Sequence, residues 1–147
     1  MKILIANDHR GLELKNKIQK YLIKNNYIVE NLGTDTETSV DYPTLAFNLA
    51  AKIDDNTLGI LICGTGIGMS IAANKVKGIR CAKVTTPEEA KLCREHNNAN
   101  VIAISSNLST VKVKKIIKNF IETNFSNDNR HKIRIDMIDD YERGNYA

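Results

Sequence analysis

The 147-residue sequence has no tryptophan, only two prolines and only 5% aromatic residues. It has three cysteines, Cys63, Cys81 and Cys93, and no CxxC pair. This odd number without paired spacing argues against a disulfide framework and against a tetrahedral zinc site. The sequence also lacks an apolar run of the ~18–20 residues that a membrane helix needs. The N-terminus, Met1–Ile5, has an apolar stretch far too short for a signal peptide. We therefore expect no membrane partner and a cytoplasmic location.

Charges of the two signs are nearly balanced, with 21 Lys and Arg against 17 Asp and Glu and a net charge of +4. This excess is too small to indicate nucleic acid, but it is compatible with an anionic ligand. The densest basic cluster, Lys112–Lys118, contains no aromatic or arginine residue, and we interpret it as a solvated helix face. Since a domain typically spans roughly 100–200 residues, we expect residues 1–147 to form one domain.

Short apolar stretches alternate along the chain with segments of helical periodicity. The stretches that predict strands are Lys2–Ala6, Tyr27–Leu32, Leu58–Cys63, Ile79–Val84 and Asn100–Ile104. Such alternation indicates βαβ units and a parallel sheet. We predict an α/β protein with a three-layer α/β/α Rossmann-like fold. Its five parallel strands, numbered along the chain, are expected in the order 2-1-3-4-5, and a further helix is expected after Ser126.

Three loops are predicted to meet at one edge of this sheet, where the strands have their carboxyl ends. They follow the first strand (residues 8–9), the third (residues 63–68) and the fourth (residues 85–86). Ligands of open parallel sheets bind beyond this edge. We therefore look for the functional site among these loops.

The loop after the third predicted strand has glycine at alternate positions, Gly64, Gly66 and Gly68, and a helical pattern follows it. Unpaired amides at the start of a helix can bind an anion. The pattern does not fit a dinucleotide site, because Met69 occupies the position where GxGxxG requires its last glycine. A purely structural tight turn is the alternative interpretation.

Cys63 ends the most continuously apolar stretch and directly precedes the glycine turn. A thiolate next to a helix N-terminus is stabilised by the amides there and can act as a base or a nucleophile. Free cysteine is also a common small core residue. We expect that core role for Cys81 and Cys93, and for Cys63 both interpretations stay open.

The three histidines, His9, His96 and His131, lie in different predicted segments and show no i, i+4 pairing. We therefore expect no metal site, and each histidine alone fits a surface or capping position. Arg130 and Arg134 are four residues apart, so on a helix they would share one face and could bind a phosphate. A solvated helix face is the alternative for these two arginines.

Several of these motifs occur together, in order and at a characteristic spacing over essentially the whole chain. They are Asn7–His9, Thr38–Pro43, Ile62–Gly68 with Ala72–Lys75, His96–Val101 and Arg130–Arg134. In this combination the chain resembles the ribose-5-phosphate isomerase B family. That family also includes allose-6-phosphate isomerase and the subunits of galactose-6-phosphate isomerase.

The resemblance implies an aldose–ketose isomerase that interconverts ribose 5-phosphate and ribulose 5-phosphate through an enediolate. This reaction belongs to the non-oxidative branch of the pentose phosphate pathway, and the resemblance implies no metal and no cofactor. The partner would be a small sugar phosphate and not a nucleic acid. The resemblance also implies a homodimer, or a dimer of such dimers, whose active sites draw residues from both subunits.

The same resemblance assigns roles to single residues. Cys63 would move the proton between C1 and C2, and His96 would open the sugar ring with help from Asp41, in one subunit or across two. The enediolate oxygen would be stabilised by Thr65 together with Gly64, Gly66, Ile67 and Gly68. Sugar hydroxyls would be contacted by Asp8, Tyr42 and Asn97, and the phosphate by His9, Arg130 and Arg134. An enediolate mechanism needs such a base, an anion-binding turn and a separate acid–base group.

One position departs from the family pattern. Asn107 stands just after the fifth predicted strand, where the family usually carries an arginine that contacts the phosphate. A hexose 6-phosphate, of allose or galactose, therefore stays open as substrate. Two other classes also stay open: a phosphate- or nucleotide-binding module without chemistry, and a thiol-dependent transferase with Cys63 as nucleophile.

Overall fold

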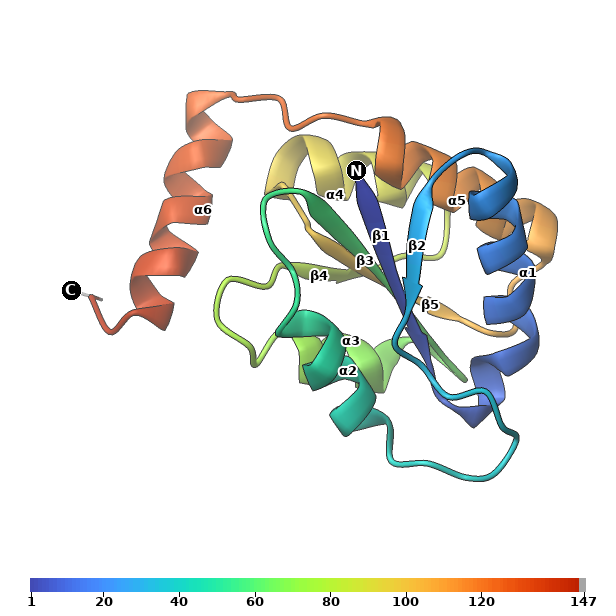
Figure 1. Ribbon diagram of the computed structural model, residues 1–147. Helices are drawn as coiled ribbons and strands as arrows, with labels where there is room; N and C mark the ends of the chain where they lie inside the picture. The colour runs from blue at the N-terminus through green and yellow to red at the C-terminus, as the bar shows by residue number, and fades with distance from the viewer. Residues whose placement is uncertain (146–147) are drawn as a thin grey trace.

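In the computed structural model, which describes residues 1–145, five parallel strands form one sheet with helices on both faces (Figure 1). The strands are β1 (Lys2–Asn7), β2 (Ile28–Asn31), β3 (Thr57–Cys63), β4 (Cys81–Lys83) and β5 (Val101–Ser105). The helices are the 3₁₀ turn η1 (His9–Gly11), α1 (Leu12–Lys24), α2 (Tyr42–Ala50), α3 (Ile67–Ala73), α4 (Pro87–Asn97), α5 (Thr110–Glu122) and α6 (Asn129–Glu142). The predicted three-layer α/β/α fold with a C-terminal helix is confirmed.

The predicted strand order 2-1-3-4-5 is wrong for its last two strands, because the observed order is β2-β1-β3-β5-β4. β5 pairs with β3, and β4 pairs with β5. The burial of the two strands explains this placement. The first four of the five residues of β5 are buried, whereas in β4 one residue of three, Cys81, is buried. A strand covered on both faces belongs inside a parallel sheet, and a short, partly exposed strand belongs at its edge.

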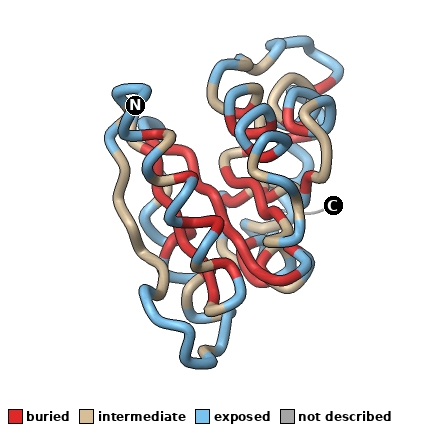
Figure 2. The backbone as a smooth tube through the Cα atoms, turned by 90° about the vertical axis from the view of Figure 1, so that its right-hand side faces the viewer, coloured by how far each residue is buried: buried red, intermediate tan, exposed pale blue. Residues whose placement is uncertain are grey.

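Alternate side chains of the central strands build a separate hydrophobic core on each face of the sheet. Ile3 and Ile5 of β1 pack in one core with residues of α1, α4 and α5. Leu4 and Ala6 pack in the other core with residues of α2 and α3, and Cys63 belongs to this second core. Figure 2 shows these strands as the buried centre of the molecule, with exposed loops at their ends. The sheet therefore holds the loops of the carboxyl edge on a rigid base.

Helix α4 begins where the sequence signals place it and runs between the two edges of the sheet. Pro87 is in its first turn, and the Thr86 hydroxyl caps it by accepting a hydrogen bond from the N–H of Glu89 (3.1 Å). The helix follows the carboxyl end of β4 and leads into the amino end of β5. It therefore carries His96, in its last turn, to the amino edge of the sheet.

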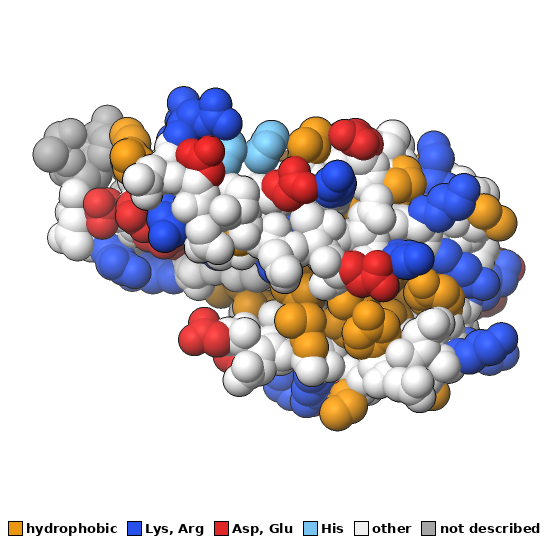
Figure 3. Space-filling view, turned by 90° about the horizontal axis from the view of Figure 1, so that it is seen from above, with side chains coloured by type: hydrophobic (Ala, Val, Ile, Leu, Met, Phe, Trp, Pro, Cys, Tyr) orange, Lys and Arg blue, Asp and Glu red, His pale blue; other side chains and the backbone are white. Residues whose placement is uncertain are grey.

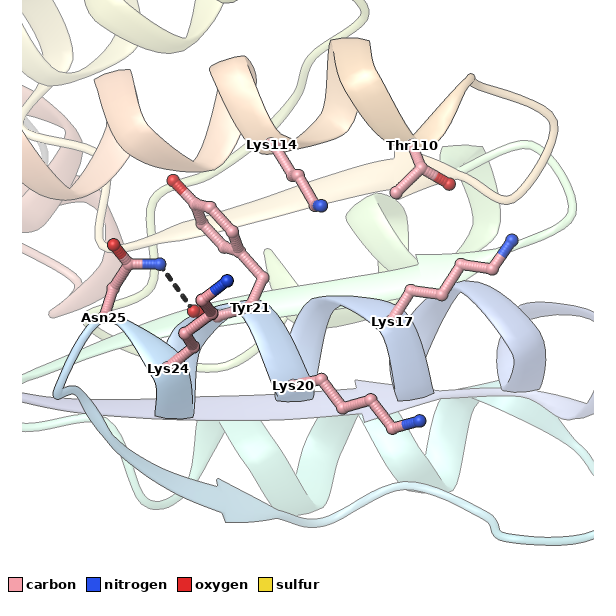
Figure 4. A pocket seen from close by; sticks show the side chains of 7 residues that line it. All are labelled: Lys17, Lys20, Tyr21, Lys24, Asn25, Thr110 and Lys114. Atoms are coloured by element: carbon pink, nitrogen blue, oxygen red, sulfur yellow. Dashed lines mark hydrogen bonds between the residues drawn. The ribbon is translucent and has the colours of Figure 1, made fainter.

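The lysines of α5 are exposed, as the solvated-face interpretation predicts. A groove of about 710 Å³ lies between α1 and α5, and Figure 4 shows the side chains that line it. Two of its cations have partners within the groove or beside it. The Nζ of Lys114 lies 5.5 Å from the centroid of the Tyr21 ring, and that of Lys17 lies 3.3 Å from the carboxylate of Glu13.

The last helix, α6, stands beside the sheet, away from the edge where β1 and β3 end (Figure 1). Its large apolar side chains Ile133, Met137, Ile138 and Tyr141 are between 49% and 66% exposed. The predicted last helix forms, but most of its large apolar residues do not pack on the core of their own chain. Within residues 1–145, no helix combines the length and the hydrophobicity needed to cross a membrane.

Candidate active site

Cys63 lies at the carboxyl end of β3, where the glycine turn folds back over its sulfur. The Sγ atom accepts a hydrogen bond from the N–H of Gly66 (3.1 Å), and the residue is 5% exposed. Gly66 has a φ of +79°, and a Cβ there would lie 3.0 Å from the carbonyl carbon of Ile104. Both the backbone conformation and the space require glycine at this position. The turn thus directs an N–H dipole at the sulfur, which stabilises negative charge on it.

The other two cysteines have the core role that the sequence predicts. Both are buried, and burial raises the pKa of Cys81 to about 12 and that of Cys93 to about 11. The Cys93 thiol donates a hydrogen bond to the carbonyl of Ala90 (3.2 Å). These two sulfurs therefore stay protonated at neutral pH.

The rest of the glycine turn is fixed by contacts from three elements. The N–H of Ile67 donates to the Thr65 hydroxyl (3.2 Å), and the Ser105 hydroxyl donates to the carbonyl of Gly64 (2.8 Å). The Tyr42 ring, at the start of α2, lies so close to Gly68 that a Cβ there would be 2.6 Å from the ring Cζ atom. Tyr42, predicted as a sugar ligand, therefore lies directly against the turn that holds Cys63.

The loop after β1 meets the loop before α2 at the same edge. The carboxylate of Asp8 accepts hydrogen bonds from the N–H groups of Arg10 (3.0 Å) and Gly11 (3.1 Å), and Asp8 is 6% exposed. The Nδ1 atom of His9 accepts a hydrogen bond from the N–H of Val40 (3.2 Å). This bond leaves Nε2 of the neutral ring as its donor. Asp41 follows Val40 directly, so His9 also fixes the segment that carries Asp41.

An ion pair that is buried only at its lysine end, and that sequence reasoning missed, connects the loop before α2 to α1. The Lys15 side chain is fully buried, and its ammonium group pairs with the carboxylate of Asp35, whose side chain is 70% exposed. Asn31 donates a second hydrogen bond to the same carboxylate oxygen (2.9 Å). The Lys15 ammonium and the Asn31 amide hold the pKa of Asp35 below its usual value. A signal was present in the sequence, because Lys15 precedes the apolar Ile18 and Leu22 by three and seven residues, on the buried face of α1.

Replacement of Asp35 by asparagine is expected to destabilise the protein more than replacement of Lys15 by methionine. The first change leaves a buried ammonium without a carboxylate, at a cost of about 1–3 kcal/mol, which is less than for a pair buried at both ends. The second change removes the buried charge and keeps a side chain of similar length. Urea unfolding at pH 7 measures both, with the exposed Glu37→Gln in the same loop as control.

The same pair predicts how stability depends on acid. Since the pKa of Asp35 is lower in the folded than in the unfolded chain, its contribution is complete above the usual value of 3.8 and is lost as the pH falls through the folded value. This acid-induced loss should be smaller in Lys15→Met. Equal destabilisation by Asp35→Asn and Lys15→Met at pH 7 would contradict the account of this pair.

The remaining predicted residues, His96, Asn97, Arg130 and Arg134, lie elsewhere on the molecule. The His96 ring stacks on that of His131 with centroids 4.5 Å apart, and Arg130 donates a hydrogen bond to Nε2 of His131 (3.3 Å). Figure 3 shows histidine side chains beside basic side chains, Lys or Arg, on the face that it displays. His131 is 9% exposed, and burial together with the charges of His96 and Arg130 lowers its pKa. The sequence motif contained His131, but no role was predicted for it.

Within one chain, the residues around Cys63 and the residues around His96 do not lie together. Cys63 ends β3, whereas His96 and Asn97 precede β5 at the other edge of the sheet, where Arg80 donates a hydrogen bond to the carbonyl of Asn97 (3.1 Å). β3 has seven residues, and since a strand rises roughly 3.3 Å per residue, the two edges lie about 20 Å apart. Within residues 1–145, no three His, Cys, Asp or Glu side chains form a group that could hold a metal ion.

The fold and the motifs define the class of protein to which the chain belongs. A family model described as Ribose/Galactose Isomerase matches residues 3–138, so the chain is a member of the ribose/galactose isomerase family. The ribose-5-phosphate isomerase B structure from Clostridium thermocellum superposes with a TM-score of 0.93 at 39% identity, covering 99% of each chain. The enzyme of that name from Mycoplasma genitalium, solved with bound ribulose-5-phosphate, gives 0.92 at 44% identity, over 97% of this chain and 96% of that one. A putative sugar phosphate isomerase of Bacillus subtilis, YwlF, is 43% identical over 149 residues and 99% of each chain. The resemblance drawn from the sequence motifs is confirmed.

Proposed function

We propose that the chain interconverts D-ribose 5-phosphate and D-ribulose 5-phosphate. One observation carries this proposal: the sulfur of Cys63 lies under the glycine turn with an N–H group directed at it, in a chain that belongs to an isomerase family. The Mycoplasma genitalium relative that was solved with ribulose-5-phosphate is 44% identical to this chain. The substrate class therefore follows from the relatives, and the chemistry follows from the turn.

The reaction moves one proton between neighbouring carbons. The Cys63 thiolate removes the proton from C2 of the open-chain aldose, and the electron pair moves through the C1–C2 bond onto the carbonyl oxygen. This forms the enediolate, and return of the proton to C1, with transfer of the hydroxyl proton from O2 to O1, gives the ketose. The turn from Gly64 to Gly68, with the Thr65 hydroxyl, stabilises the enediolate oxygen, and a well-placed donor contributes roughly 3–4 kcal/mol.

Two copies of the chain complete each site in this proposal. His96 of one copy opens the sugar ring with Asp41 of the other, while Asn97, Arg130 and Arg134 approach the sugar phosphate from the side opposite to His9. The separation of the two groups by about 20 Å within one chain supports this arrangement. Exposed apolar residues also accompany both groups, with Ile67 and Ile71 on α3 and Met137 and Ile138 on α6. A twofold dimer would cover these surfaces and produce two equal sites.

We also propose that each copy forms one domain and that the enzyme works in the cytoplasm. The three cysteines are free, which suits a reducing compartment. The homodimer is the minimal assembly that supplies both halves of a site, and a dimer of such dimers would preserve them.

Turnover measurements on three substrates test this function. Purified protein is incubated with ribose 5-phosphate, allose 6-phosphate and galactose 6-phosphate, and ketose formation is followed. We expect the highest kcat/KM with ribose 5-phosphate. A hexose 6-phosphate as the best substrate would reassign the specificity, in line with Asn107 at the position of the usual arginine. Absence of turnover with all three would favour a binding module, and a covalent adduct on Cys63 in the intact mass would favour a transferase.

A further inference from the structure

Arg10 occupies a fixed position between β1 and β3. It is the middle residue of η1, whose backbone is capped by the Asp8 carboxylate. The next residue, Gly11, packs so closely on β3 that a Cβ there would lie 2.7 Å from Cγ2 of Ile62. The backbone of Arg10 is therefore held beside the carboxyl end of β3, one residue after His9.

The guanidinium group of Arg10 lies over Gly64, the first residue of the turn after Cys63. A Cβ at Gly64 would lie 2.6 Å from Nη1, 2.8 Å from Cζ and 3.0 Å from Nε of Arg10. A Cβ would therefore meet the guanidinium at close range, so in this structure the guanidinium lies against the backbone of this glycine. A cationic group is thereby placed directly against the turn that the proposed mechanism uses.

This cation has no carboxylate partner among residues 1–145. Other cations of the chain do have one, since Lys15 pairs with Asp35 and Arg80 lies 3.7 Å from the carboxylate of Asp139. Arg10 is also an exposed residue, so its N–H groups can reach a ligand. An unpaired guanidinium with a fixed backbone suits two-point binding of a phosphate oxyanion.

Asn107 contacts the same glycine from the loop after β5. Its Nδ2 atom lies 3.4 Å from the carbonyl oxygen of Gly64, and its N–H donates to the Ser105 hydroxyl (3.1 Å). The side chains of Arg10 and Asn107 therefore converge on one residue, and Asn107 is neutral. The positive charge at this point of the site comes from Arg10.

We propose that Arg10 binds the phosphate group of the sugar phosphate and that Asn107 supplies a neutral donor beside it. The assignment rests on the proposed function, because it places a sugar phosphate in the site. It also agrees with the neighbouring residue, His9, which the same proposal directs to the phosphate. Arg10 is then a residue that determines the affinity for phosphorylated substrates, and it takes no part in proton transfer.

Binding of inorganic phosphate, measured by titration calorimetry, tests the assignment without relying on turnover. The proteins are the wild type, Arg10→Ala, Arg10→Lys and the control Lys20→Ala, which removes an exposed charge from α1 outside the site. We expect Arg10→Ala to weaken phosphate binding and to raise KM for ribose 5-phosphate about tenfold to hundredfold, with kcat essentially unchanged. Arg10→Lys should be intermediate, and Lys20→Ala should equal the wild type.

A second variant tests the convergence on Gly64. Asn107→Arg in the Arg10→Ala background should recover most of the lost phosphate affinity, because it returns a guanidinium to the same glycine. Wild-type affinity in Arg10→Ala, or a fall in kcat at unchanged KM, would overturn the assignment. If the wild type binds phosphate through Arg10 but does not isomerise ribose 5-phosphate, the proposed function fails and the phosphate site stands.

Discussion

Replacing Cys63 by alanine should abolish nearly all conversion of ribose 5-phosphate to ribulose 5-phosphate in a protein that still folds. A positioned acid–base group typically contributes 10²- to 10⁴-fold to a rate, so we expect a loss of about a thousandfold or more. The change removes one sulfur from a site that is 5% exposed, and the cost in stability should be about 1 kcal/mol. The variant should therefore lose its turnover while its stability changes little.

Steady-state ketose formation and thermal unfolding measure these two effects. Cys93→Ala is the matched control, because it also removes a buried thiol, but from the core on the opposite face of the sheet. That variant should keep wild-type turnover. Full turnover in Cys63→Ala would end the assignment of the base.

Replacing His96 by asparagine should also greatly reduce turnover of ribose 5-phosphate. Unlike Cys63→Ala, this variant should still exchange the C1 proton of ribulose 5-phosphate. Ribose 5-phosphate enters as a ring that must be opened, so its turnover should fall by about 10²- to 10⁴-fold. Ribulose 5-phosphate has an open chain, and its C1 proton can still be removed by Cys63. The variant should therefore continue to exchange that proton with deuterium from solvent.

Proton NMR in deuterated water follows this exchange on ribulose 5-phosphate. Cys63→Ala should lose both exchange and turnover, whereas His96→Asn should lose turnover and keep most of the exchange. Equal losses of exchange in the two variants would show that His96 acts on the reacting carbons and not on the ring.

Local signals in the sequence were sufficient for the elements that build the cysteine turn. The run from Leu58 to Cys63 predicts a buried strand, and the glycines after it predict a tight turn into a helix. The same holds for α4, whose start is specified by Thr86 and Pro87. These features depend on short-range backbone preferences, which a sequence displays directly.

Contacts between distant segments could not be predicted in the same way. The βαβ pattern is equally compatible with β4 or β5 beside β3, and the choice depends on how much of each strand the helices cover. The contact of Arg10 with Gly64 exists because η1 packs on β3, and no local pattern signals it. For the ion pair of Lys15 with Asp35, the sequence contains one indication, a lysine on the apolar face of a predicted helix. It does not indicate which carboxylate is the partner.

The position of His96 follows from a rule that was available from the sequence. A residue between a helix and the next parallel strand lies at the amino edge of the sheet, so His96 could not share an edge with Cys63 in one chain. The exposed apolar residues of α6 are a second indication of a partner copy, since their own chain does not cover them. Both observations support the proposal that a second copy completes the active site.

Mixing the two inactive variants tests this shared site most directly. Cys63→Ala and His96→Asn proteins are unfolded together, refolded as a mixture, and assayed with ribose 5-phosphate. In a mixed dimer, one site carries both substitutions and the other carries neither, so random pairing should restore roughly a quarter of wild-type activity. If the mixture remains as inactive as its two components while mixed dimers are shown to form, Cys63 and His96 do not act together across two subunits.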